Sequence, residues 1–285
     1  MEKALKKYSP IFVLPTLLAF TIGFIVPFFE GLYLSFCQFT TVKNAKWVGI
    51  SNYQRVFADE AFLHSFGFTV KYAVVAIILI NVIALCLALL LTRNIKGTNI
   101  FRTVFFMPNL IGGIVLGYIW QILINCILSL VGQPLLALNS QAGYWGIIVL
   151  TAWQQIGYMM IIYIAGLQNV PDDLIEAAQI DGASRFKIML HIDIPTILPT
   201  IVIMLILRSG HILSVGYEKA LLMQNDANIK YSQLISTYVY NEGLMKGFKQ
   251  YSSATAINLF NSIINFICIW SVNQFSKKVG ESSLW

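Results

Sequence analysis

The sequence predicts an all-α integral membrane protein with six membrane-spanning helices. Of its 285 residues, 57% are hydrophobic and 11% are charged, whereas a soluble domain has about 25% charged residues. The mean hydropathy of +0.71 points the same way. Six windows also approach the roughly 20 consecutive apolar residues that a helix needs to cross a bilayer.

The predicted spans follow one another along a single domain that covers residues 1–285. The first apolar run follows a basic amino-terminal stretch and is too long for the core of a signal peptide, so we expect a retained span. The second ends at the basic loop that Arg93 begins, Pro108 stands near the start of the third, and Pro195 begins the fifth. The spans are expected at residues 11–36, 67–92, 103–130, 145–168, 195–216 and 254–273.

The distribution of Lys and Arg predicts the orientation. Basic residues are dense in the amino-terminal stretch, the short loop 93–102, the segment 169–194 and the tail, and they are diluted over the longer segments 37–66 and 217–253. Because short loops rich in Lys and Arg stay in the cytoplasm, we expect both termini there. The chain would be a multi-pass protein of the bacterial plasma (inner) membrane.

Several classes of function are not expected. The formal net charge of +6 comes from small basic groups beside apolar runs, which does not suggest a nucleic-acid partner. The four cysteines and three histidines show no spacing typical of a metal site, and no nucleophile motif accompanies them. The sequence has no phosphate-binding loop of the type Gly-x-x-x-x-Gly-Lys-Ser/Thr, so the chain itself is not expected to hydrolyse ATP.

The inner segment 169–194 predicts a helix, a break and a second helix. Pro171 suits the first turn of a helix, and acidic residues follow it near the positive end of the helix dipole. Gly182 supplies the break, and Ser184 or Ala183 can begin a second short helix. Two short amphipathic helices between two spans could dock into a groove on a cytoplasmic partner. Helices that lie on the membrane surface are the alternative.

The same segment resembles a known motif. Glu176-Ala177-Ala178, Gly182 and the stretch 192–195 are similar to the EAA motif of the permeases of ABC importers, with Ile194 in place of the usual leucine. The resemblance extends over the whole chain and points to the carbohydrate-uptake (maltose-type) branch, closest to its oligosaccharide permeases. It rests on segments 165–171, 176–183, 216–225 and 235–244, and on Trp47–Tyr53, Phe101–Thr103, Met107-Pro108 and Trp120.

The resemblance implies a type I importer transmembrane domain with a cytoplasmic EAA coupling helix. In that family this helix docks into a cleft of an ATPase dimer, which binds ATP and Mg. The resemblance therefore assigns no cofactor to this chain. By analogy, Glu176 and Asp181 would contact the ATPase, Ala177 and Ala178 would permit a close approach, and Gly182 would permit the turn.

Candidate substrate-path residues lie in the fourth and fifth spans. Sugars are bound by aromatic faces and by amide or hydroxyl groups, and Trp153, Gln154, Gln155 and Tyr158 supply that mixture. The related maltose permeases contact sugar in these same two spans, although a polar contact with a second permease explains the set equally well. In the fifth span, Arg208 and His211 are candidates because charged groups in a membrane usually line a cavity; the alternative is a position at the outer interface.

The resulting prediction is a permease subunit that imports a sugar, and more specifically an oligosaccharide, with ATP hydrolysis on a separate subunit. Its expected partners are a second, similar permease, the ATPase dimer, the lipid bilayer and an extracytoplasmic sugar-binding protein. That protein would face the outer segment 217–253, whose charges include Glu218 and Lys219. The alternatives are a gradient-driven secondary carrier, for which internal repeats and embedded carboxylates are not evident, and an ABC permease for a non-sugar solute.

Overall fold

The computed structural model describes residues 11, 13–93, 96–138, 140–210, 213, 217–224, 229, 233–245 and 251–279. Within these residues, six helices are long and apolar enough to cross a membrane, as the sequence predicts. They are Val13–Ser35, Glu60–Leu91, Gly113–Leu130, Gln141–Leu167, Arg185–Ser209 and Tyr251–Lys277. The chain folds into two compact units, one formed by residues 1–60 and 239–262 and the other by residues 61–238 and 263–285. The assignment of one domain to residues 1–285 stays a prediction.

The first unit begins with the helix Val13–Ser35, which contains the π-helical turn η1 (Thr21–Ile25) and α2 (Val26–Ser35). A two-stranded antiparallel sheet follows, in which β1 (Cys37–Gln38) pairs with β2 (Lys46–Trp47) around the turn η2 (Val42–Asn44). Helix α3 (Ser51–Ala58) comes next. The buried Asn52 amide donates hydrogen bonds to the carbonyl oxygens of Ser35 and Cys37, at 2.8 and 2.9 Å, and so holds the end of α2 against α3.

The second unit is built around α7 (Ser140–Leu167), whose apolar side chains supply much of its buried core. Helices α4 (Glu60–Leu91), α5 (Thr98–Phe106), α6 (Gly113–Leu130) and α10 (Ile194–Ser209) surround it, and the turn η4 (Leu136–Leu138) precedes it. Gly157 of α7 lies so close to α5 that a Cβ atom there would be 1.9 Å from the Phe105 carbonyl oxygen. The backbones of α5 and α7 therefore touch at this point.

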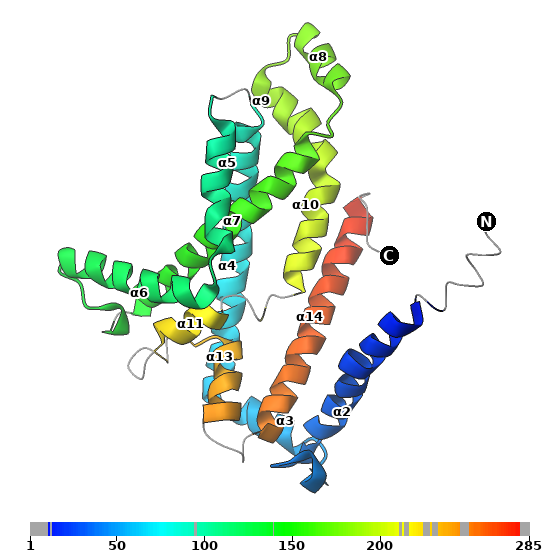
Figure 1. Ribbon diagram of the computed structural model, residues 1–285, viewed down its shortest axis with the longest axis vertical. Helices are drawn as coiled ribbons and strands as arrows, with labels where there is room; N and C mark the ends of the chain where they lie inside the picture. The colour runs from blue at the N-terminus through cyan, green and yellow to red at the C-terminus, as the bar shows by residue number, and fades with distance from the viewer. Residues whose placement is uncertain are drawn as a thin grey trace. The chain divides into compact units, whose positions relative to one another are not determined.

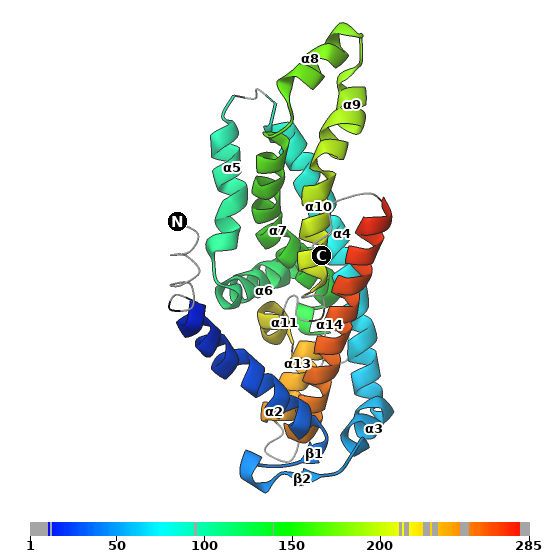
Figure 2. The same cartoon turned by 90° about the vertical axis from the view of Figure 1, so that its right-hand side faces the viewer.

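The predicted third span, 103–130, is wrong as a single helix. α5 ends at Phe106, the 3₁₀ turn η3 (Met107–Leu110) follows, and α6 begins at Gly113. α6 runs across the direction of α5 rather than along it (Figure 1 and Figure 2). Local sequence favours the break, because Pro108 has no N–H to donate and Gly112 and Gly113 are poor helix formers.

The fifth span also differs from the prediction at both ends. α9 (Arg185–Ile188), the π-helical turn η5 (Met189–Asp193) and α10 form one uninterrupted helical run, so the second short helix is continuous with the span that we expected to begin at Pro195. The run ends at Ser209, with Gly210 as its cap, rather than at 216.

The segment that we expected to be a long outer loop contains helices in its described parts. These are α11 (Tyr217–Met223), α13 (Ile235–Tyr240) and the π-helical turn η6 (Asn241–Met245). The last helix, α14 (Tyr251–Val279), begins before the predicted 254–273 and ends after it. α11 packs closely on α6, because a Cβ atom at Gly113 would be 2.1 Å from the Glu218 carboxylate and one at Gly117 would be 2.9 Å from Leu222.

Candidate coupling segment and mid-span polar cluster

The coupling segment, residues 168–193, connects α7 to α10 and extends beyond the ends of the neighbouring helices of its unit (Figure 1). Pro171 is the N-cap of α8 (Asp172–Ile180), whose first turn carries Asp172 and Asp173. Carboxylates at this end stabilise the helix through its dipole. Val170 anchors the segment, because its side chain is buried in the core of the unit.

The break after α8 is a Schellman motif. The Gly182 N–H donates to the Gln179 carbonyl at 3.0 Å, and the Ala183 N–H donates to the Ala178 carbonyl at 2.9 Å. Gly182 has a φ of +75°, a conformation that costs an L-residue about 1–2 kcal/mol. The next helix starts at once, because the Ser184 hydroxyl caps it by accepting a hydrogen bond from the Lys187 N–H.

The two faces of α8 differ. Asp172, Ile175 and Gln179 line a cavity inside the unit. The opposite face carries Asp173, Glu176, Ala177 and Ile180, all exposed and spaced three or four residues apart. We call these four residues the free face of α8. Ile180 is 86% exposed, which leaves a large apolar side chain without cover beside two carboxylates.

The residues predicted for coupling lie partly on the free face of α8 and partly in the turn that follows it. Glu176 and Ala177 lie on the free face, whereas Ala178 is half-buried, and its carbonyl accepts a hydrogen bond of the Schellman motif. Asp181 is the exposed C-cap, and Gly182 makes the turn. The free face also includes Asp173 and Ile180, which were not among the predicted coupling residues, although their three-to-four spacing with Glu176 was visible in the sequence.

The predicted substrate-path residues of α7 do not form one group. The Trp153 ring packs on Trp120 of α6, with 5.5 Å between ring centroids, and its side chain is 39% exposed. Gln154 is buried and donates from Nε2 to the Ile111 carbonyl at 2.9 Å, which stabilises the break between α5 and α6. Its position indicates a structural role. Tyr158 is 41% exposed and lies within electrostatic reach of Arg208.

Arg208 of α10 connects to α7 through Gln155. Its Nη2 donates to Gln155 Oε1 at 2.7 Å, and the half-buried guanidinium is also close enough to Tyr163 for an electrostatic interaction. The buried Tyr163 hydroxyl in turn donates to Oδ1 of Asn81 on α4. A chain of polar contacts therefore joins α4, α7 and α10. We call Asn81, Gln155, Tyr158, Tyr163 and Arg208 the mid-span polar cluster; His211 lies outside the described residues.

Lys219 is a further charged residue near this cluster. Its burial was not predicted from the sequence. Its side chain is 7% exposed, so it does not belong to the charged outer surface that we expected to meet a binding protein. Burial lowers the pKa of its ammonium group to about 8; the positive charge of Arg208 acts in the same direction, and the Glu218 carboxylate opposes it. The Lys219 ammonium therefore lies within electrostatic reach of Arg208.

Comparison with known proteins gives consistent matches over nearly the whole chain. Residues 80–281 match the family described as binding-protein-dependent transport system inner membrane component. The chain is 32% identical over 278 residues to the probable starch degradation products transport system permease protein AmyD of Thermoanaerobacterium thermosulfurigenes, across 95% of this chain and 94% of the relative.

Two further matches are similar in extent. The polygalacturonan/rhamnogalacturonan transport system permease protein YteP of Bacillus subtilis (strain 168) is 27% identical, across 98% of this chain and 91% of the relative. A crystal structure of a bacterial ABC transporter involved in the import of the acidic polysaccharide alginate superposes with a TM-score of 0.87 at 25% identity, across 97% of this chain and 98% of that chain.

Proposed function

The chain belongs to the family of inner membrane components of binding-protein-dependent transport systems, and from that premise we propose that it is a permease subunit of an ATP-driven importer for oligosaccharides. The observation that carries the proposal is the free face of α8, an exposed helix face in the segment that connects two spans. Family membership favours this reading over a gradient-driven carrier.

The free face of α8 suits a docking element. Asp173 and Glu176 offer acceptors for charged hydrogen bonds, Ala177 permits a close approach, and Ile180 offers apolar area at the end of the helix. We propose that this face docks into a cleft of a cytoplasmic ATPase. The ATPase would bind ATP and Mg. With α8 in the cytoplasm, both termini lie in the cytoplasm as well.

The substrate assignment rests on the relatives and on side-chain chemistry. The two relatives and the structural neighbour are named for transport of starch degradation products, of polygalacturonan/rhamnogalacturonan and of alginate. In this chain, the Trp120–Trp153 pair offers an aromatic surface, and the mid-span polar cluster offers hydroxyl and amide groups. Aromatic faces beside hydroxyl and amide groups are the chemistry that binds sugars.

The half-exposed side chains of α7 indicate where a second permease would stand. Trp153 and Tyr158 lie on a span yet are 39% and 41% exposed. We infer that a second, similar subunit faces this side and that the sugar passes between the two. An extracytoplasmic binding protein would deliver the sugar, which agrees with the description of the family as part of a binding-protein-dependent transport system.

The proposal is tested by purification in mild detergent followed by transport in vesicles. The tagged chain is purified from its own cells, and mass spectrometry identifies the proteins that accompany it. The complex is then reconstituted with ATP inside the vesicles, and uptake of labelled malto-oligosaccharide, oligogalacturonate and histidine is compared with and without the co-purified binding protein.

We expect an ATPase and a second permease in the purified complex, and uptake of one of the oligosaccharides that requires both ATP and the binding protein. Uptake by the chain alone, driven by an ion gradient and abolished by an ionophore, would contradict the importer. ATP-dependent uptake of histidine but of neither oligosaccharide would contradict the substrate class.

A further inference from the structure

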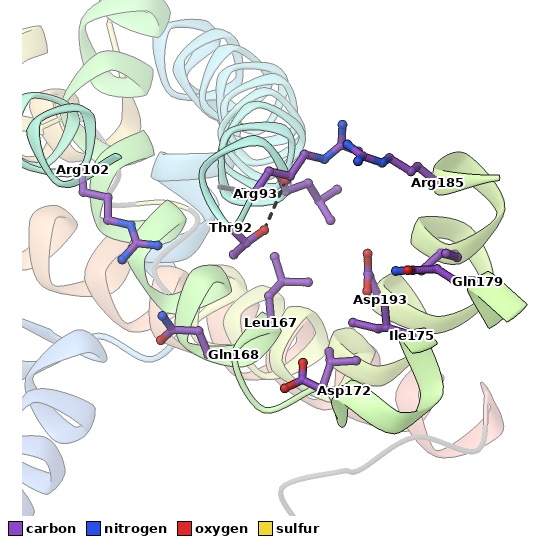
Figure 3. A pocket seen from close by; sticks show the side chains of 13 residues that line it. Thr92, Arg93, Arg102, Leu167, Gln168, Asp172, Ile175, Gln179, Arg185 and Asp193 are labelled. Atoms are coloured by element: carbon purple, nitrogen blue, oxygen red, sulfur yellow. Dashed lines mark hydrogen bonds between the residues drawn. The ribbon is translucent and has the colours of Figure 1, made fainter. Parts of the chain in front are cut away.

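The second unit contains a cavity of about 810 Å³ beside the coupling segment. Its walls come from the end of α4, the middle of α5, the end of α7, α8 and the helical run that begins with α9 (Figure 3). Neither the coupling role of the free face nor the mid-span polar cluster involves the interior of this cavity. The cavity is therefore a separate feature of the second unit.

Three arginines dominate the chemistry of the cavity. Arg93 follows α4, Arg102 belongs to α5 and Arg185 begins α9, and all three line the wall. Figure 3 shows Arg102 across the cavity from Arg185. Arg102 donates from Nη2 to the Leu91 carbonyl at 3.1 Å, while its Nε is buried without a hydrogen-bond partner.

The charges of the cavity do not cancel. Two carboxylates, Asp172 and Asp193, also line it, against three guanidinium groups. Among the described residues, none of these five side chains takes part in an ion pair. The side chains that line the cavity therefore carry one more positive than negative charge, although Arg93 also lies within electrostatic reach of Asp193. The guanidinium groups offer several N–H donors to an acceptor.

The helices that reach the cavity also carry exposed apolar side chains. Leu90 is 48% exposed, Ile100 is 69% exposed and Val104 is 54% exposed, and all three lie within a few residues of Arg93 or Arg102. Exposed apolar side chains on a membrane helix contact lipid tails, and basic groups at the helix ends lie at the level of the lipid headgroups. Arg93 and Arg102 thus belong to the ends of membrane helices whose other faces are apolar.

We propose that this cavity binds a phosphate group, supplied by the headgroup of an anionic phospholipid or by a free phosphate. Guanidinium groups match phosphate oxygens through paired N–H donors, and basic pockets at the inner ends of membrane helices bind anionic headgroups. A phosphate held by Arg93 and Arg185 would connect the end of α4 to the start of α9. Its binding would stabilise one position of the coupling segment relative to the spans.

The test measures ligand retention by the purified transporter and therefore does not depend on the transport assay above. Wild type is compared with the double variant R93Q/R185Q in bilayer nanodiscs of phosphatidylcholine, with and without phosphatidylglycerol. The control is Lys187→Gln, because Lys187 lies on the same short helix, is exposed and does not line the cavity. Native mass spectrometry counts the retained phosphatidylglycerol, and a thermal unfolding curve in phosphatidylcholine measures the effect of added inorganic phosphate.

We expect the affinity for phosphatidylglycerol to fall about fivefold for each arginine removed, and K187Q to behave like wild type. If phosphatidylglycerol is not retained but inorganic phosphate raises the unfolding temperature of wild type and not of R93Q/R185Q, the ligand is free phosphate and the site stands. Equal retention and equal phosphate response in all three proteins overturn the proposal. The charge-retaining variant R93K/R185K guards against a folding defect, since it should keep part of the binding that R93Q/R185Q loses.

Discussion

Replacing Gly182 with alanine should uncouple the transporter without disturbing its spans. A Cβ atom at Gly182 would meet nothing within 4 Å, so the substitution creates no clash. Its cost comes from the φ of +75°, which an L-residue adopts at about 1–2 kcal/mol. That free energy opposes the Schellman turn and corresponds to a factor of about 5–30 in its population. Docking that needs the turn should weaken by the same factor.

The assay is ATPase stimulation by the loaded binding protein in the reconstituted transporter, measured as a function of ATPase concentration. Gly132→Ala is the matched control, because Gly132 also has a positive φ, of +68°, with nothing within 4 Å, and precedes α7, whereas the coupling segment follows α7. Gly182→Asn should restore most of the coupling, since asparagine tolerates this conformation. Normal coupling in Gly182→Ala, or an equal loss in Gly182→Asn, would refute the reasoning.

Three further predictions address other features. Ile180→Ser should weaken ATPase binding yet leave the unfolding temperature unchanged, because Ile180 is 86% exposed; a lower unfolding temperature would argue against a docking role. Gly157→Ala should destabilise the protein by about 1–3 kcal/mol, because the added methyl group would overpack against Phe105. Gly67→Ala, in open space on α4, should not destabilise it. Thermal unfolding of the two variants measures the difference. The pKa of Lys219 is about 8 in the folded chain against an ordinary 10.5, so the unfolded chain holds more protons between these values and stability should rise with pH across that window. Lys219→Met should abolish this rise, and an unchanged pH profile of unfolding would contradict the burial of the charge.

The sequence was sufficient for features that depend on neighbouring residues. The number of spans follows from apolar composition, and the break in the coupling segment follows from Gly182 and Ser184, whose capping roles need no distant partner. The location of the free face was also accessible from helical spacing, although we singled out only Glu176 and Ala177 of its four members.

Features that depend on distant residues could not be predicted. Pro108 alone is compatible with a kinked helix, but the observed break also involves the Gln154 amide, which binds the Ile111 carbonyl from 43 residues away. The sequence alone places Lys219 in a charged outer loop. Its burial becomes apparent only in the structure, where α11 packs against α6 at Gly113 and Gly117. Glycine spacing on α6 permits such packing but does not identify the partner helix.

The helical run from Arg185 to Ser209 is long enough to work as a lever. Its inner end adjoins Ser184 and the coupling turn, and Arg208 stands at its outer end, about 35 Å away at 1.5 Å per residue. A tilt of about 10° about the inner end would carry the Arg208 guanidinium roughly 6 Å sideways at that length, farther than its 2.7 Å hydrogen bond to Gln155 can stretch. A small rotation at the end beside the coupling turn would thus be enough to exchange the hydrogen-bond partner of Arg208, which lies near Tyr158 and Tyr163 of α7.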